Sequence, residues 1–209
     1  LAVAGGPPGR RRALVAVGAS TGGVAALSEM LEPLPREMPP LVIAQHMPTG
    51  YTGRFARRLA ERLSRDVAEA REGEALAPGL VRIAPGDRHL EIAAENGRFV
   101  TRLTDDAPVS GHRPSVDVLF ASVARAAGAG AIGVILTGMG RDGAAGLRAM
   151  RRAGAACFGQ SERTCVVYGM PRAAREMGAV EDELDLDRLP ARILDAARGS
   201  VERRTPVQL

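Results

Sequence analysis

The sequence of 209 residues contains no lysine and no tryptophan, and aromatic residues make up only 3% of it. All 28 basic residues are therefore arginines. The absence of lysine excludes a P-loop lysine, a lysine Schiff base and a Ser-Lys catalytic dyad. The scarcity of aromatic rings argues against a nucleic-acid site built from stacking platforms, and it leaves Val, Leu, Ile and Ala to form the core.

Cysteines and long apolar runs are also scarce. The two cysteines, Cys157 and Cys165, match neither a zinc-binding spacing nor a disulfide framework. No apolar run approaches the roughly 18 residues that a membrane-spanning helix needs. Residues 1–9 are too short and too rich in Pro and Gly for a signal peptide. We expect a cytoplasmic protein with no metal site and no membrane insertion.

The positive charge is concentrated at the two ends of the chain. The formal net charge is +4, but five arginines lie at 10–12 and 203–204, and residues 13–201 carry 23 arginines against 23 acidic residues. A neutral body lacks the basic face that a nucleic-acid duplex would require. We expect no nucleic-acid partner.

Short apolar runs alternate with helical periodicity, a pattern typical of βα units that build a parallel sheet. The sequence predicts an α/β fold, with a doubly wound, mostly parallel sheet flanked by helices. In the middle of the chain, Asn96-Gly97 separates two extended runs and predicts an inserted antiparallel β-hairpin. The acidic segment 181–187 is expected to be a surface connection. The expected strands are 14–17, 41–45, 80–84, 131–136 and 156–158, and the expected helices include 24–31, 144–152 and 189–197.

The chain is expected to form one domain between two tails. We place a linker or tail at 1–12, a single domain at 13–198 and a C-terminal tail at 199–209. The sequence begins with Leu and continues into a run rich in Pro, Gly and Arg. This composition is typical of a linker and suggests a piece of a longer chain.

Residues 18–22 read GASTG and stand between the first predicted strand and the first predicted helix. A Gly-x-Ser-x-Gly turn can hold the Ser20 hydroxyl clear of the backbone, and the helix start offers unpaired amides at Thr21 and Gly22 to an oxyanion. The alternative is an ordinary helix N-cap serine.

His46 and Asp142 follow two other predicted strands. His46 is the only histidine that ends a strand of the parallel set, which makes it the best candidate for a general base, although a lone histidine is more often structural. Asp142 lies in a glycine-rich strand exit, where a helix N-cap aspartate is the alternative. Together with Ser20 they would supply the nucleophile, base and carboxylate of a serine hydrolase.

Six stretches of the sequence resemble the catalytic domain of the chemotaxis protein-glutamate methylesterases, the CheB family. They appear in family order across nearly all of residues 13–197. The stretches are VGASTGG at 17–23, QHMP at 45–48, IAPGD at 83–87, HRPSVDVLF at 112–120, LTGMGRDGA at 136–144 and GMP at 169–171.

The resemblance implies a catalytic triad of Ser20 as nucleophile, His46 as general base and Asp142 as the carboxylate that orients it. It also favours the Met139 amide as an oxyanion donor and implies that no cofactor is required. The implied reaction hydrolyses γ-methyl esters of glutamates on the cytoplasmic domain of chemotaxis receptors, with deamidation of receptor glutamines as a second activity. Full-length relatives also carry a receiver domain, which no part of these 209 residues resembles.

Two other functions remain as alternatives from the sequence. A Rossmann-like module would bind a dinucleotide at the first βα turn, but this turn lacks the Gly-x-Gly-x-x-Gly spacing. A noncatalytic adaptor would dock on receptors without turnover.

Two further hypotheses concern arginines. Arg141 would lower the pKa of Asp142 if the two side chains are close. The arginines at 57, 58, 62 and 65 form either a solvated helix face or a receptor contact.

Overall fold

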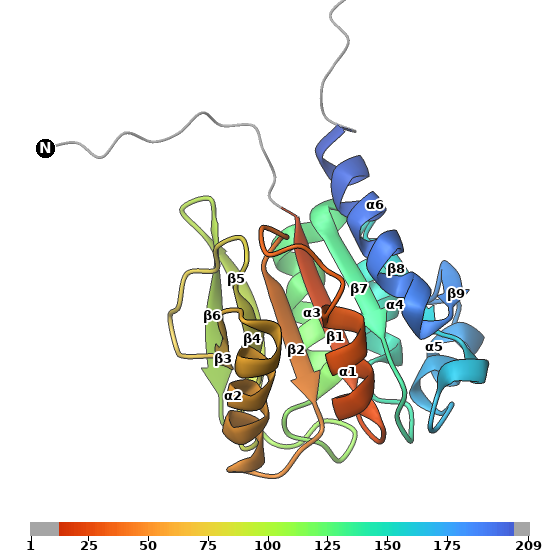
Figure 1. Cartoon of the computed structure of the whole chain (residues 1–209), viewed down its shortest axis with the longest axis horizontal. Helices are drawn as coiled ribbons and strands as arrows, with labels where there is room; N and C mark the ends of the chain where they lie inside the picture. The colour runs from red at the N-terminus through yellow and green to blue at the C-terminus, as the bar shows by residue number, and fades with distance from the viewer. Residues whose placement is uncertain (1–12, 203–209) are drawn as a thin grey trace, which may run out of the picture.

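The structure is a computed structural model that describes residues 13–202, except for the side chains of 200–202. A seven-stranded parallel sheet forms its centre (Figure 1). The strand order is β3-β4-β2-β1-β7-β8-β9, so the central β1 has β2 and β7 as direct neighbours. Because parallel strands all end at one edge, β2, β1 and β7 deliver their following residues to the same place. The strands are β1 (Leu14–Ala19), β2 (Leu41–Gln45), β3 (Val67–Glu69), β4 (Val81–Ile83), β7 (Ala131–Ile135), β8 (Ala156–Gln160) and β9 (Asp182–Leu184).

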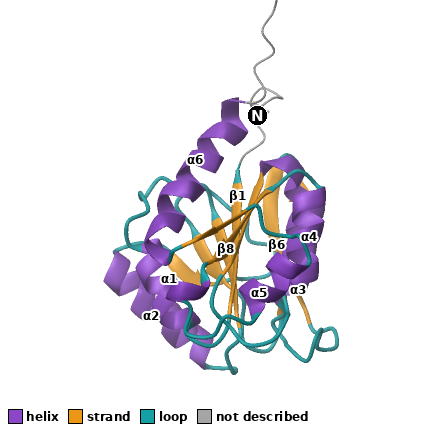
Figure 2. Cartoon of the chain, turned by 90° about the vertical axis from the view of Figure 1, so that its right-hand side faces the viewer, coloured by secondary structure: helices purple, strands orange, loops and turns teal. Residues whose placement is uncertain are grey.

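Helices cover both faces of the sheet, which creates two separate cores (Figure 2). One face is covered by α1 (Gly23–Leu31), α2 (Tyr51–Leu63) and α6 (Leu189–Glu202), and the other by α3 (Val116–Ala127), α4 (Ala144–Arg152) and α5 (Met170–Glu176). Successive side chains of β1 alternate between the cores, with Val15 and Val17 in one and Leu14 and Ala16 in the other. Burial on both faces explains why β1 is apolar throughout. Short 3-10 turns occur at Gly128–Gly130, Glu162–Thr164 and Leu186–Arg188.

The predicted hairpin is confirmed as a separate antiparallel pair, β5 (His89–Glu95) and β6 (Arg98–Thr104). Asn96 and Gly97 both have positive φ, which a tight two-residue hairpin turn requires. The Ile92 amide donates to the Ser122 hydroxyl at 2.9 Å, which ties the hairpin to α3.

The doubly wound α/β fold is confirmed, while three elements were not expected from the sequence. The segment 181–187, expected as a surface connection, contains β9, which pairs with β8 at the edge of the sheet. Neither β3 nor α5 was expected from the sequence. Helix α6 continues to Glu202, past the boundary expected at 198. The tails at 1–12 and 203–209 lie outside the described residues, and the three-part division of the chain stays a prediction.

The start of α3 is packed directly against β1 at Gly18. A Cβ atom on Gly18 would lie 2.2 Å from Cγ1 of Val116 and 3.2 Å from the Phe120 ring. Only glycine therefore permits this close approach. The contact brings the first turn of α3 to the end of β1, where the candidate site residues begin.

We predict that Gly18→Ala lowers the free energy of unfolding by about 1–3 kcal/mol, because the added methyl group overpacks the α3 interface. Urea unfolding of the parent and variant measures the difference. Adding Val116→Ala to Gly18→Ala should recover part of the loss by removing the clashing methyl groups. Equal stability of the parent and Gly18→Ala would contradict the packing argument.

Candidate active site

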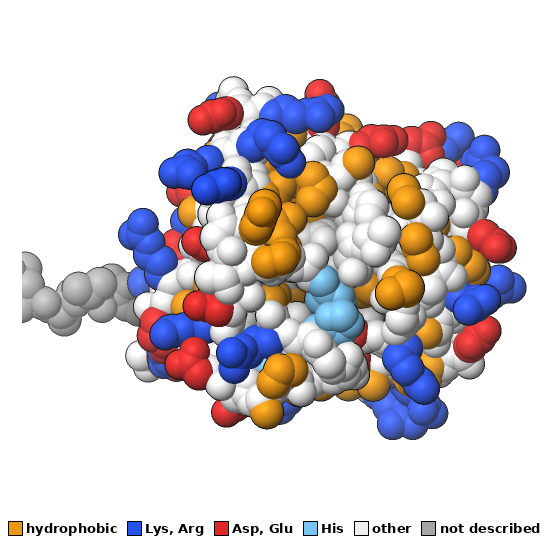
Figure 3. Space-filling view, turned by 90° about the horizontal axis from the view of Figure 1, so that it is seen from below, with side chains coloured by type: hydrophobic (Ala, Val, Ile, Leu, Met, Phe, Trp, Pro, Cys, Tyr) orange, Lys and Arg blue, Asp and Glu red, His pale blue; other side chains and the backbone are white. Residues whose placement is uncertain are grey.

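Three strand ends bring the sequence-predicted residues together at the carboxyl edge of the sheet. The His46 amide donates to the Ala19 carbonyl at 3.1 Å, and the Ser20 amide donates to the Thr137 carbonyl at 3.0 Å. The segments after β1, β2 and β7 are therefore joined by backbone hydrogen bonds. Figure 3 views this edge, where histidine side chains lie near the centre with hydrophobic side chains on either side.

The second and third members of the proposed triad are in direct contact. Nε2 of His46 lies 2.7 Å from Oδ2 of Asp142. The two side chains are 8% and 1% exposed. Burial protects this hydrogen bond from competition with water, so Asp142 can fix the orientation of the imidazole ring.

Asp142 is also held by the first turn of α3. Its carboxylate accepts hydrogen bonds from the Ser115 hydroxyl at 2.8 Å, the Val116 amide at 2.7 Å and the Asp117 amide at 3.0 Å. Burial alone would raise the pKa of Asp142, but the hydrogen bonds from His46 and from these three donors lower it below its ordinary value. The carboxylate is thus kept ionised inside the protein.

The structure does not support the N-cap alternatives for Ser20 and Asp142. Gly22 caps α1 and Gly143 caps α4, and neither helix start receives a side-chain cap hydrogen bond. Asp142 binds the start of α3 instead of capping the helix that follows it. Ser20 is the first residue after β1 and stands two residues before the cap position.

His46 presents one nitrogen without a partner. An ionised carboxylate can only accept hydrogen bonds, so Nε2 carries the proton of the neutral ring and Nδ1 keeps its lone pair. Nδ1 is buried and has no hydrogen-bond partner among the described residues. A general base needs such a free lone pair.

Gln45 links the backbones of Ser20 and His46, a role that the sequence did not indicate. Its Nε2 donates to the carbonyl oxygens of Ser20 at 2.9 Å and His46 at 3.0 Å. The side chain is buried although it is polar. A polar residue at the last position of an otherwise apolar strand was the available signal.

His112 was also missed as part of the site. Its ring stacks on the His46 ring, with centroids 3.7 Å apart and planes within 9°. A short bridge holds His112 in place, because the amides and carbonyls of Val109 and His112 pair reciprocally at 3.0 Å. Burial lowers the pKa of His112, and so does the repulsion that would arise if both stacked rings were protonated.

His89 has a structural role in the hairpin, away from the end of any strand of the parallel sheet. Its side chain is buried, Nδ1 accepts from the Ser115 amide at 3.1 Å, and Nε2 lies 3.1 Å from the Ala107 carbonyl. The Nε2–H therefore donates to that carbonyl. His89 thereby helps to position Ser115, whose hydroxyl group donates a hydrogen bond to Asp142.

The predicted oxyanion donors lie around the same edge. Thr21 is exposed, Gly22 is half-buried, and Met139, in the loop after β7, is 71% exposed. Within the part of the chain that the structure describes, the amides of these three residues donate to no protein acceptor. They are free to bind a developing negative charge, and this role stays a prediction.

The remaining candidates have simpler environments. Arg141 is exposed and, among the described residues, forms no ion pair with Asp142, so it does not account for the lowered pKa of that carboxyl. Cys157 is buried and Cys165 half-buried, and burial raises their pKa values to about 12 and about 11. Among residues 13–202 we find no cluster of His, Cys, Asp and Glu that could hold a metal ion.

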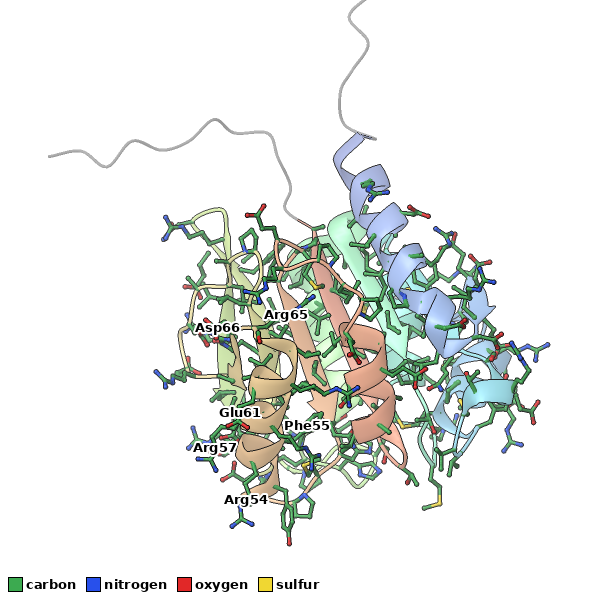
Figure 4. All side chains as sticks on the ribbon, viewed as in Figure 1. Arg54, Phe55, Arg57, Glu61, Arg65 and Asp66 are labelled. Carbon is green, nitrogen blue, oxygen red and sulfur yellow. The ribbon has the colours of Figure 1, made fainter. Side chains whose placement is uncertain are left out.

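Arg54 and Arg57 of α2 are exposed and extend to the outside of the molecule (Figure 4). Phe55 is buried on the inner side, whereas Arg57 is exposed. Arg62 pairs with Glu32 at 2.7 Å, and both side chains are more than half exposed. Arg57, Arg58 and Arg62 thus form a solvated helix face, and the contact with a receptor stays a prediction. Arg65 differs, because it follows the end of α2, is half-buried and places Nη1 3.7 Å from Sδ of Met38. None of the helices in the described range is long and apolar enough to span a bilayer.

Comparison with known proteins gives a consistent result. The CheB methylesterase family model matches residues 15–193. Protein-glutamate methylesterase/protein-glutamine glutaminase 4 of Anaeromyxobacter dehalogenans is 54% identical over 184 residues, which is 88% of this chain and 52% of that protein. Protein-glutamate methylesterase/protein-glutamine glutaminase 2 of Pseudomonas aeruginosa PAO1 is 52% identical over 193 residues, which is 91% of this chain and 55% of that protein. The chain thus spans about half the length of the curated relatives it matches.

A solved structure agrees with the fold. The crystal structure of the Thermotoga maritima CheB methylesterase catalytic domain superposes with a TM-score of 0.86 at 37% sequence identity. The match covers 88% of this chain and 98% of that domain.

We predict that the free energy of unfolding falls more in the parent than in His112→Phe when the pH is lowered from 7.5 to 5.5. The lowered pKa of His112 keeps it neutral in the folded state, so below about pH 6.5 the unfolded chain binds the proton first. This contribution is present above pH 6.5 and is lost as the pH falls through the folded pKa. Urea unfolding at both pH values measures it, and an identical pH dependence in the two proteins would contradict the assignment.

Proposed function

Because the chain belongs to the CheB methylesterase family, we propose that it is a serine hydrolase that removes γ-methyl esters from protein glutamates, giving glutamate and methanol. Ser20 is the nucleophile, His46 the general base, and Asp142 the carboxylate that orients and stabilises the imidazole. The observation that carries the proposal is the buried His46–Asp142 hydrogen bond, which leaves Nδ1 of His46 free. His46 follows β2, which pairs with β1, and Ser20 is the first residue after β1.

The acylation step begins when the Ser20 Oγ attacks the ester carbonyl carbon and transfers its proton to Nδ1 of His46. The tetrahedral oxyanion accepts hydrogen bonds from the amides of Met139 and of Thr21 or Gly22, donors of a kind worth about 3 kcal/mol each. The ionised Asp142 stabilises the imidazolium. Collapse breaks the bond to the methoxy group, which takes the proton from Nδ1 and leaves as methanol.

The deacylation step repeats the same chemistry with water. Water attacks the acyl carbon while Nδ1 takes its proton, and collapse breaks the bond to Ser20, which recovers the proton. A free glutamate carboxyl group is released. The groups that carry the cycle are three side chains, backbone amides and water.

The relatives' names suggest a second activity on glutamine. Attack of Ser20 on a γ-carboxamide would follow the same path, with ammonia in place of methanol as the leaving group. Both relatives described above are named glutaminases as well as methylesterases. We propose chemotaxis receptors as the partners of this chain, through their cytoplasmic domains, and the cytoplasm as its location.

We predict that Ser20→Ala lowers methanol release from a methylated receptor by 10⁴-fold or more, because the nucleophile is lost. Asp142→Asn should lower it by about 10⁴-fold, because the amide cannot stabilise the imidazolium. Methanol is measured enzymatically after incubation with the receptor, and urea unfolding verifies that each variant is folded.

Ser28→Ala is the matched control, since the Ser28 hydroxyl only donates to the Val24 carbonyl within α1. It should keep the parent rate. Equal methanol release by the parent and Ser20→Ala would refute the proposal. No release by a folded parent protein would favour a noncatalytic adaptor, and nicotinamide cofactor retained through purification would favour a dinucleotide-binding module.

A further inference from the structure

A groove of about 480 Å³ opens beside the loop that carries Met139. Its lining includes Gly140 and Arg141 from this loop, and Gly169 and Arg172 from the start of α5. The loop passes beside the proposed nucleophile, because a Cβ atom on Gly138 would lie 2.8 Å from Cβ of Ser20. None of the proposed catalytic steps uses this groove.

The two walls of the groove are fixed to each other. The Gly138 carbonyl accepts from the amides of Gly169 at 3.1 Å and Met170 at 2.8 Å, and the Gly138 amide donates to the Val167 carbonyl at 3.0 Å. A Cβ atom on Gly169 would lie 2.7 Å from the Gly138 oxygen and 3.0 Å from the Gly140 nitrogen. Glycine at 169 therefore allows the loop and α5 to abut, and the groove exists before any ligand arrives.

The groove has an excess of positive charge. Arg141 is exposed and has no acidic partner among the described residues. Arg172 is 64% exposed and comes no closer than 4.0 Å to Glu176, which is 71% exposed. A pair this open contributes little, so the Arg172 guanidinium is available to a ligand. Two guanidinium groups face a groove that holds one carboxylate.

Exposed apolar side chains accompany this charge. Met139 and Val166 are 71% and 69% exposed, and they are among the four large hydrophobic residues most open to solvent in the described part of the chain. Cβ of Val166 would lie 2.6 Å from a Cβ atom on Gly22, so Val166 lies beside the turn that carries Ser20. Exposed apolar side chains in the loops around the proposed site, together with the guanidinium groups that line the groove, fit a peptide segment that is both apolar and acidic.

We propose that Arg141 and Arg172 form a subsite that binds the carboxylate of an acidic residue flanking the reacting glutamate ester. The proposal rests on the proposed function, since it assigns specificity to that same site. A guanidinium binds a carboxylate through a planar pair of N–H donors, which gives direction as well as attraction. The enzyme would therefore favour methylated glutamates that lie among other acidic residues.

Two synthetic peptides test the subsite with the full chain. Each carries one glutamate γ-methyl ester and the same apolar residues, with flanking glutamates in one peptide and flanking glutamines in the other. The quantity compared is the ratio of kcat/KM for the acidic peptide to that for the neutral peptide at low salt. A substitution that lowers kcat/KM equally for both peptides leaves this ratio unchanged.

We predict that the parent prefers the acidic peptide through a lower KM. Arg141→Gln and Arg172→Gln should each reduce the preference about threefold, and the double variant about tenfold. Raising the salt concentration should reduce the parent's preference and leave that of the double variant nearly constant, because salt screens exposed charges. Arg152→Gln, an exposed arginine at the far end of α4, is the matched control and should keep the parent ratio.

An unchanged ratio in the double variant, or a loss of the same size in Arg152→Gln, would overturn the subsite. These outcomes are distinct from failure of the proposed function, in which the parent hydrolyses neither peptide or Ser20→Ala hydrolyses both at the parent rate. In that case, fluorescence anisotropy of the labelled acidic peptide decides the question. Tighter binding to the parent than to the double variant would support the subsite, and equal binding would reject it.

Discussion

The buried carboxylate of Asp142 is the interaction on which the site depends. An ion in the interior is tolerated only when its charge is compensated, and here four donors surround one side chain. Three of those donors belong to the first turn of α3 and the fourth is the His46 ring. The same hydrogen bonds that stabilise the charge therefore determine where the imidazole lies and which of its nitrogens remains free.

The hydrogen bonds to Asp142 depend on residues that lie outside the proposed triad. The first turn of α3 can reach Asp142 only because Gly18 leaves room for Val116 against β1. His89, in the hairpin, holds the Ser115 amide, so the inserted hairpin supports the carboxylate as well. The hairpin thus helps to position the α3 residues that bind Asp142, although it is not part of the main sheet. In the same way, the hydrogen bonds at Gly138 join the loop with Met139 to α5 and fix the groove beside it.

The sequence predicted the central strands and the contact between His46 and Asp142 because both depend on regular features. Apolar β-branched runs identify buried strands, and parallel strands end at a common edge. The edge strands β3 and β9 escaped prediction because each has three residues, and β9 (Asp182–Leu184) is mostly acidic. His112 and Ser115 escaped because their positions follow from the path of an irregular loop across the sheet edge. No local pattern encodes that path. The condition placed on Arg141, that its side chain lie close to Asp142, is not met, since neighbours in sequence need not point toward each other.

The strand order has a consequence for how the protein is made. The central β1 precedes the other strands of the sheet in the sequence, but one of its two neighbours, β7, lies more than a hundred residues later. Parallel pairings of such long range form late in folding. During translation, Ser20 and His46 leave the ribosome well before Asp142 exists, so the nascent chain carries an alcohol and an imidazole with no carboxylate to align them. On the proposed function, an incomplete chain that ends before Asp142 lacks the carboxylate that aligns the imidazole, so efficient hydrolysis would require the completed sheet.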